Sequence, residues 1–91
     1  MRVEWDERKA ARNEHDHGVS FEEAVTALMD PLAVTFFDEA ATDEVREITV
    51  GHSIRGRLLL VVHTERKGNV VRVISAREAT RKERKAHEEG I

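Results

Sequence analysis

Three arginines near the C-terminal end recur at a spacing that would bring them together on one helix. Arg77, Arg81 and Arg84 stand at i, i+4 and i+7 within residues 77–89, a segment rich in helix formers and free of glycine and proline. A guanidinium presents a planar fork of donors and stays charged at cellular pH, which suits phosphate. The spacing predicts a phosphate-binding ridge; the alternative is a solvated helix face whose arginines pair with nearby glutamates.

The histidines offer groups that could transfer protons. Alternation along the segment 57–64 places His63 on the same strand face as Arg57, where it is either a half-buried core residue or a catalytic one. His87 follows Glu83 by four residues and shares a stripe of the terminal helix with it. His17 lies at a predicted helix end, where the helix dipole favours a partly positive imidazole.

Most other catalytic chemistries lack their residues in this sequence. There is no cysteine, and neither His15-x-His17 nor the separate His52 and His63 has the spacing of a zinc site, so we expect no metal and no cofactor. Nucleotide-binding glycine loops and a Ser-His-Asp signature are also missing. RNA cleavage without metal needs a base, an acid and cations for the phosphorane charge, and this composition permits it without selecting it.

The composition is that of a folded domain with a densely charged surface. The 91 residues are 40% hydrophobic and 36% charged, which predicts a single domain over residues 1–91. Residues 1–50 hold 5 Lys+Arg and 13 Asp+Glu, whereas residues 51–91 hold 10 and 5, so a phosphate site is expected to be local to the second half. No apolar run suits a signal peptide or a membrane helix, and we expect a cytoplasmic protein.

Hydrophobic periodicity and capping residues predict eight elements. Asp6 and Ser20 are helix N-caps, and Gly18 and Asp30-Pro31 are helix stops. The expected strands are 2–5, 33–37, 45–50, 57–64 and 70–75, and the expected helices are 7–16, one between Ser20 and Asp30, and 77–89.

This order, β-α-α-β-β-β-β-α, predicts an α+β fold with a single antiparallel sheet. Two helices would cover one face of the sheet and leave the other face open, with the C-terminal helix near the edge. The run Leu58–Val62 has no polar side, which predicts a central strand covered on both faces. Arg77 is expected to be in phase with Val71 and Val73.

Several spaced motifs cover nearly the whole chain. They are Trp5-Asp6-Glu7-x-Lys9-Ala10-x-x-Asn13, His17-Gly18-Val19-Ser20-Phe21-Glu22-Glu23-Ala24, Asp30-Pro31, Gly56-Arg57-Leu58-Leu59-Leu60-Val61-Val62-His63-Thr64, and Arg72-Val73-Ile74-Ser75-Ala76-Arg77-Glu78-Ala79-Thr80-Arg81-Lys82-Glu83-Arg84. In this order they resemble the signatures of the BrnT toxins.

The resemblance implies a ribonuclease toxin of a type II toxin–antitoxin pair with a RelE-like fold. It also implies a BrnA-type antitoxin partner, with which the toxin forms a complex such as a heterotetramer and represses their operon. Because this chain shows no helix-turn-helix pattern, contact with operator DNA is expected through the antitoxin.

By analogy with RelE-like toxins, the RNA site would lie on the open sheet face. Arg57 and Arg77 would contact phosphate, followed by Arg81. The candidate proton-transfer groups are Glu83, His63, His17 and His87, and Lys9, His17 and Arg84 are the candidate RNA-binding residues.

Two departures from the family pattern bear on activity. Asp16 stands where the family commonly has Lys, and its charge would oppose RNA near His17; His87 stands where the family often has Tyr and keeps a proton donor. An alternative is therefore an inactive toxin homologue that acts only as an antitoxin-binding co-repressor. An unrelated RNA-binding module would need exposed aromatics. The aromatic residues of the sequence, all predicted to be in the core, are Trp5, Phe21, Phe36 and Phe37.

Overall fold

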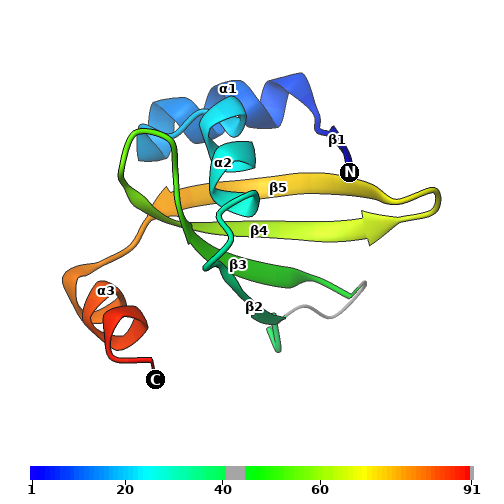
Figure 1. Cartoon of the computed structure of the whole chain (residues 1–91). Helices are drawn as coiled ribbons and strands as arrows, with labels where there is room; N and C mark the ends of the chain where they lie inside the picture. Colours follow the sequence, from blue (N-terminus) through cyan, green and yellow to red (C-terminus); the bar gives the residue numbers. More distant parts are fainter. Residues whose placement is uncertain (41–44, 91) are drawn as a thin grey trace.

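Two helices cover one face of a five-stranded sheet, and a third helix follows the last strand (Figure 1). The computed structural model describes residues 1–40 and 45–90. The elements, in chain order, are β1 (Arg2–Glu4), α1 (Glu7–His17), α2 (Phe21–Leu28), β2 (Val34–Phe37), β3 (Glu47–His52), β4 (Leu58–Arg66), β5 (Val70–Glu78) and α3 (Arg81–Glu88).

Local capping explains where the first two helices begin and end. The Asp6 carboxylate accepts hydrogen bonds from the backbone N–H groups of Arg8 and Lys9, and the Ser20 hydroxyl accepts one from Glu23. Gly18 takes a left-handed φ of 69°, which ends α1 and turns the chain towards α2. These contacts satisfy backbone donors that a helix N-terminus otherwise leaves unpaired.

The sheet is mixed, so the expectation of a purely antiparallel sheet is wrong. Its strand order is β1-β5-β4-β3-β2, and β2 to β5 form the expected antiparallel meander. β1 pairs parallel with β5, with Arg2 opposite Val70 and Glu4 opposite Arg72. A strand joined to its sheet through two helices is not confined by a tight turn, so it can lie parallel to its neighbour.

A β-bulge in β5 reverses the facing of the last part of that strand. Val62 is opposite Ser75 and His63 is opposite Val73, so Ile74 has no partner. Val73 before the bulge and Ala76 after it both lie in the core under the helices. Arg77 therefore points to the other face, opposite Leu60, and the expected phase with Val71 and Val73 is wrong.

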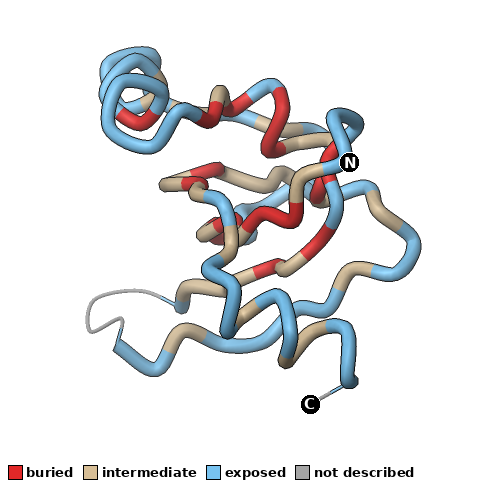
Figure 2. Tube along the Cα trace, turned by 90° about the vertical axis from the view of Figure 1, so that its left-hand side faces the viewer, coloured by how far each residue is buried: buried red, intermediate tan, exposed pale blue. Residues whose placement is uncertain are grey.

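The core lies between the two helices and the sheet (Figure 2). Its buried members are Val19, Phe21, Ala24 and Ala27 from the helical layer, and Leu59, Val61, Val73 and Ala76 from the strands. The other sheet face is less covered than expected, because Leu60 and Val62 remain partly exposed. Phe36 and Phe37 on the edge strand β2 are 48% and 69% exposed, so their predicted place in the core is wrong.

The C-terminal helix begins at Arg81, four residues later than the predicted start at residue 77. Arg77 and Glu78 still pair with Leu60 and Leu59 of β4, and Thr80 caps α3 through a capping box with Glu83. No residue of α3 is buried. Within the described parts of the chain, no helix is long and apolar enough to cross a membrane.

Candidate functional site

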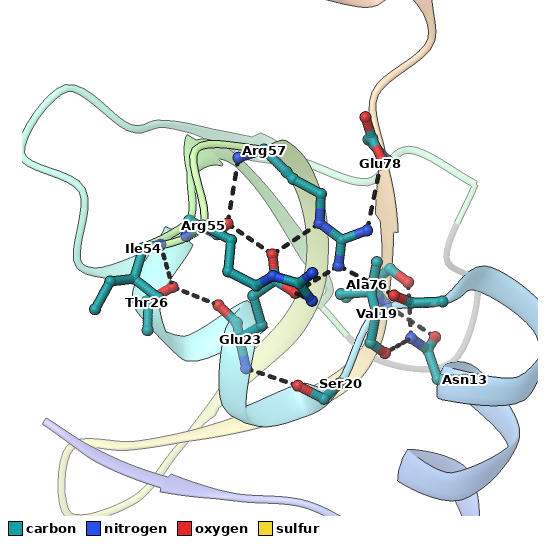
Figure 3. Close-up of polar contacts among 12 residues, drawn as sticks. Asn13, Val19, Ser20, Glu23, Thr26, Ile54, Arg55, Arg57, Ala76 and Glu78 are labelled. Carbon is teal, nitrogen blue, oxygen red and sulfur yellow. Dashed lines mark hydrogen bonds and ion pairs between the residues drawn. The ribbon is translucent and has the colours of Figure 1, made fainter.

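Arg57 lies beside the first turn of α2 and forms part of a polar network around Glu23 (Figure 3). Its Nε donates to Glu23 Oε2 at 2.9 Å, and its Nη2 donates to Glu23 Oε1 and to the Gly18 carbonyl. Ser53 also donates to the Glu23 carboxylate, at 2.7 Å. Glu23 is 6% exposed, so this carboxylate is nearly removed from water.

The network fixes the charge of both partners. Hydrogen bonding to Arg57 lowers the pKa of Glu23, and hydrogen bonding to Glu23 raises the pKa of Arg57. A buried carboxylate needs such a partner, because desolvation of an unpaired charge is costly. Arg57 joins α2, the α1–α2 turn and, through Glu78 at 3.6 Å, strand β5. The expectation that Arg57 lies with Arg77 on the open face is therefore wrong.

Arg77 projects from the open face and is held by Glu83 of α3. Its Nη1 and Nη2 donate to the two carboxylate oxygens of Glu83 at 2.8 and 2.9 Å. Glu83 Oε1 also accepts from the backbone N–H of Thr80, at 2.9 Å. The Arg77 guanidinium and this backbone bond lower the pKa of Glu83 to about 2, which makes the paired carboxylate a weak base.

A shallow hollow on the open face brings Arg77 together with His17 from the end of α1. Its floor is apolar and consists mainly of Ile48, Leu60 and Val62. Ser75 contributes a hydroxyl to the same hollow. The last turn of α1 reaches this face because β1 pairs only with residues Val70, Val71 and Arg72, which leaves the later part of β5 as an edge.

Asn13 of α1 forms hydrogen bonds with the edge of β5. Its Nδ2 donates to the carbonyl oxygens of Ala76, at 2.8 Å, and Val19, at 2.9 Å, and its Oδ1 accepts from the Ala76 N–H at 3.0 Å. The side-chain amide thus pairs with both backbone groups of Ala76 as a neighbouring strand would. This contact sets α1, and with it His17, beside Arg77.

A second hollow adjoins the first and shares His17 and Ser75 with it. Lys9, Arg12 and Asp16 line it from α1, and Ile74 lines it from the bulge in β5. Lys9 thus approaches the expected RNA face. Asp16, the residue that departs from the family pattern, lies in the same hollow, where its Oδ1 is 3.1 Å from His15 Nδ1.

His63 is 6% exposed and lies on the helix-covered side of the sheet. Its Nε2 is 2.7 Å from the Thr49 hydroxyl oxygen, which is 2.7 Å from that of Thr35. Burial lowers the pKa of His63, so its neutral form is favoured. The structure therefore separates His63 from Arg77 and supports the core interpretation.

The remaining predicted residues of α3 do not line either hollow. The His87 ring lies edge-on to that of His52, with centroids 6.0 Å apart. Arg84 Nη2 is 3.7 Å from Glu78 Oε2, and Arg81 is exposed. Because Arg77 belongs to β5, it does not form one helical ridge with Arg81 and Arg84.

No group of three or more histidines or carboxylates among the described residues is placed to hold a metal ion.

The sequence matches the family model of BrnT, the ribonuclease toxin of type II toxin–antitoxin systems, over residues 5–83. This chain belongs to the BrnT family. Its fold is similar to the 1.1 Å crystal structure of the Brucella abortus ribonuclease toxin BrnT, with a TM-score of 0.71 and 25% sequence identity. The similarity covers 89% of this chain and 99% of that one. No protein with curated annotation matches the sequence significantly.

The candidate site of this BrnT-family chain thus contains only some of the predicted catalytic and RNA-binding residues. Arg77 lies with Glu83, and the adjoining hollows hold His17 and Lys9. Arg12 and Ser75, which were not predicted as site residues, line the hollows as well. A signal for Arg12 is present, because it follows Lys9 by three residues on the same predicted helix.

Proposed function

We propose that this BrnT-family toxin is a metal-independent endoribonuclease acting at the hollow between α1 and β5. The main observation in support is that Arg77 and His17 line the same hollow, above an apolar floor and beside the Ser75 hydroxyl. Transfer of the 2′-hydroxyl proton to a base lets the 2′-oxygen attack phosphorus. The 5′-oxygen then leaves with a proton from an acid, and a 2′,3′-cyclic phosphate remains.

His17 is the proton-transfer group that the geometry favours. It is exposed at the end of α1, and an imidazole can accept or donate a proton near neutral pH. Glu83 is the second candidate, although its pairing with Arg77 keeps it ionised and weakly basic. An RNA phosphate would compete with Glu83 for the Arg77 fork, because both present oxygens at the spacing of a bidentate contact.

The test is cleavage of a single-stranded RNA in EDTA by purified wild type, Arg77→Gln and His17→Gln. Loss of a group that stabilises transition-state charge costs about 10²–10³-fold in rate, and loss of a general base costs about 10²–10⁴-fold. Arg66→Gln is the matched control, since Arg66 is an exposed arginine at the far hairpin end of β4. Undiminished cleavage by both site variants would refute the proposed site.

For the cellular role, we propose translation inhibition in the cytoplasm through RNA cleavage, with neutralisation by a BrnA-type antitoxin. We further propose that the fold is related to that of RelE toxins. The toxin and antitoxin would form a complex such as a heterotetramer, and the antitoxin would contact operator DNA. Inhibition of a cell-free translation reaction by wild type, and its reversal by BrnA-type antitoxin, are the expected results. Full translation in the presence of wild type would contradict this role.

The second candidate function is an inactive co-repressor, and two observations favour it. Asp16 places a negative charge in the hollow that holds Lys9, and Glu83 already occupies the Arg77 fork. Such a protein would bind its antitoxin and repress the operon without cleaving RNA. Repression in cells together with undetectable cleavage by wild type would establish this alternative.

A further inference from the structure

We propose that the hollow lined by Lys9 and Arg12 is a second phosphate subsite, which extends the proposed RNA site by one nucleotide along α1. This inference rests on the proposed function and adds Arg12 as a substrate-binding residue. It also assigns the substrate class, since a ligand that spans both hollows must carry at least two phosphates, as a single-stranded RNA of three or more nucleotides does.

The two hollows lie next to each other on α1 and β5. They share His17 and Ser75, and the bulge residue Ile74 lies at the wall of the second one. Their volumes are about 260 and 280 Å³, below the usual range of complete small-molecule pockets. Two small neighbouring hollows with shared lining residues suit successive units of a longer ligand.

The cations of the second hollow are available to an external anion. Within the described parts of the chain, neither the Lys9 nor the Arg12 side chain makes a hydrogen bond or ion pair, and both residues are exposed. The charge of Lys9 acts on the nearby Asp6 carboxylate without an ion pair between them. Arg57 and Arg77, in contrast, are bound to Glu23 and Glu83. A phosphate at Lys9 and Arg12 therefore has no hydrogen-bonded carboxylate to displace, whereas one at Arg77 must displace Glu83.

The two hollows differ in their lining, and this difference gives the RNA a defined position. The first hollow has an apolar floor of Ile48, Leu60 and Val62, against which a base can lie, while Arg77 takes the adjacent phosphate. The next phosphate then falls beside Arg12 and Lys9. Asp16 lines this second hollow and opposes the bound phosphate, so it sets a limit on the affinity there.

The experiment measures binding separately from cleavage. A mixed-sequence 2′-O-methyl hexanucleotide, which cannot undergo 2′-attack, is titrated against wild type, Arg12→Gln, Asp16→Asn and Arg66→Gln at several salt concentrations. A 2′-O-methyl dinucleoside monophosphate, with a single phosphate, is measured by competition.

For Arg12→Gln we expect about tenfold weaker hexanucleotide binding, since a hydrogen bond to a charged group contributes roughly one factor of ten or more. The slope of log K against log salt should decrease by about 0.7, the value for one single-strand phosphate contact. Binding of the dinucleoside monophosphate should stay unchanged. Asp16→Asn should tighten hexanucleotide binding.

The inference is overturned if Arg12→Gln binds the hexanucleotide like Arg66→Gln, or if wild type does not bind it. Salt-dependent hexanucleotide binding that is lost in Arg12→Gln supports the subsite even where unmodified RNA stays intact, in which case only the proposed cleavage fails. If wild type cleaves RNA and Arg12→Gln does not change hexanucleotide binding, the second subsite is refuted and the proposed cleavage function stands.

Discussion

At the level of single residues, the two arginines expected to contact phosphate have different environments. Arg57 completes a nearly buried carboxylate network with Glu23, whereas Arg77 faces outwards beside His17. Both are paired with a carboxylate, yet only Arg77 can exchange its partner for a ligand without leaving a charge buried. We therefore assign Arg57 to stability and Arg77 to the candidate site.

Replacement of Arg57 should lower stability more than activity. In Arg57→Met, Glu23 loses its main partner, and we expect a decrease of about 3 kcal/mol in the free energy of unfolding. Arg72→Met, which breaks the more exposed pair with Glu4, should cost less than about 1 kcal/mol. Urea titration measures both changes.

The double variant Glu23→Met, Arg57→Met should recover part of the loss, because it leaves no unpaired charge. RNA cleavage by Arg57→Met below its unfolding temperature should persist. Unchanged stability together with lost cleavage would instead place Arg57 at the RNA, as the family resemblance implies.

At the scale of elements, the β5 edge and α1 form one unit. β1 ends at Glu4, so among the described residues no strand pairs with the remainder of β5 on that side, and the bulge at Ile74 turns Arg77 outwards. The amide of Asn13 then occupies the position of a missing strand at Ala76. The end of α1 and the end of β5 are held in register by this side chain.

Asn13→Ala should loosen this unit. It leaves the buried N–H and C=O groups of Ala76 without their partner, and we expect a stability loss of about 2–3 kcal/mol. Hydrogen exchange at the Ala76 amide should accelerate, and RNA cleavage should fall because His17 loses its fixed place beside Arg77.

Glu14→Ala, on the exposed side of the same helix, is the matched control and should change none of these quantities appreciably. Unaltered Ala76 exchange in Asn13→Ala would show that the edge does not depend on the amide.

At the scale of the whole molecule, charge couples stability to pH in two steps. Burial lowers the pKa of His63 in the folded protein, whereas the unfolded chain takes up this proton near pH 6.5. Its stabilising contribution is thus complete above pH 6.5 and is lost as the pH falls. Glu83 is ionised down to a pKa of about 2, so its contribution is present above pH 4.5 and disappears between 4.5 and 2.

Urea titrations between pH 8 and pH 3 should show this decline. Wild type is expected to lose at most about 1.4 kcal/mol per pH unit through His63 below pH 6.5. In His63→Gln this first step should vanish, while the second, below pH 4.5, should remain. A decline between pH 6.5 and 5 that is identical in both proteins would show that His63 is not its source.

Local structure and family membership could be predicted from the amino-acid sequence alone. Asp6, Gly18 and Ser20 act through neighbours a few residues away, so their effects on α1 and α2 can be predicted without the rest of the chain. The Thr80-x-x-Glu83 pattern is a comparable signal, and it would have placed the start of α3 correctly. The spaced motifs led to the BrnT family, which the family model and the Brucella structure support.

The contacts between distant side chains, in contrast, could not be predicted before the fold was known. A strand pattern of period two assigns faces correctly only where pairing is regular, and the bulge opposite Val62 and His63 reverses the facing of everything after it. The parallel pairing of β1 and the burial of His63 likewise depend on contacts between distant segments. Arg57 and Arg77 consequently lie on opposite faces of the sheet. The face on which each side chain lies depends on strand pairing and on the bulge, and both form only when distant segments come together on folding.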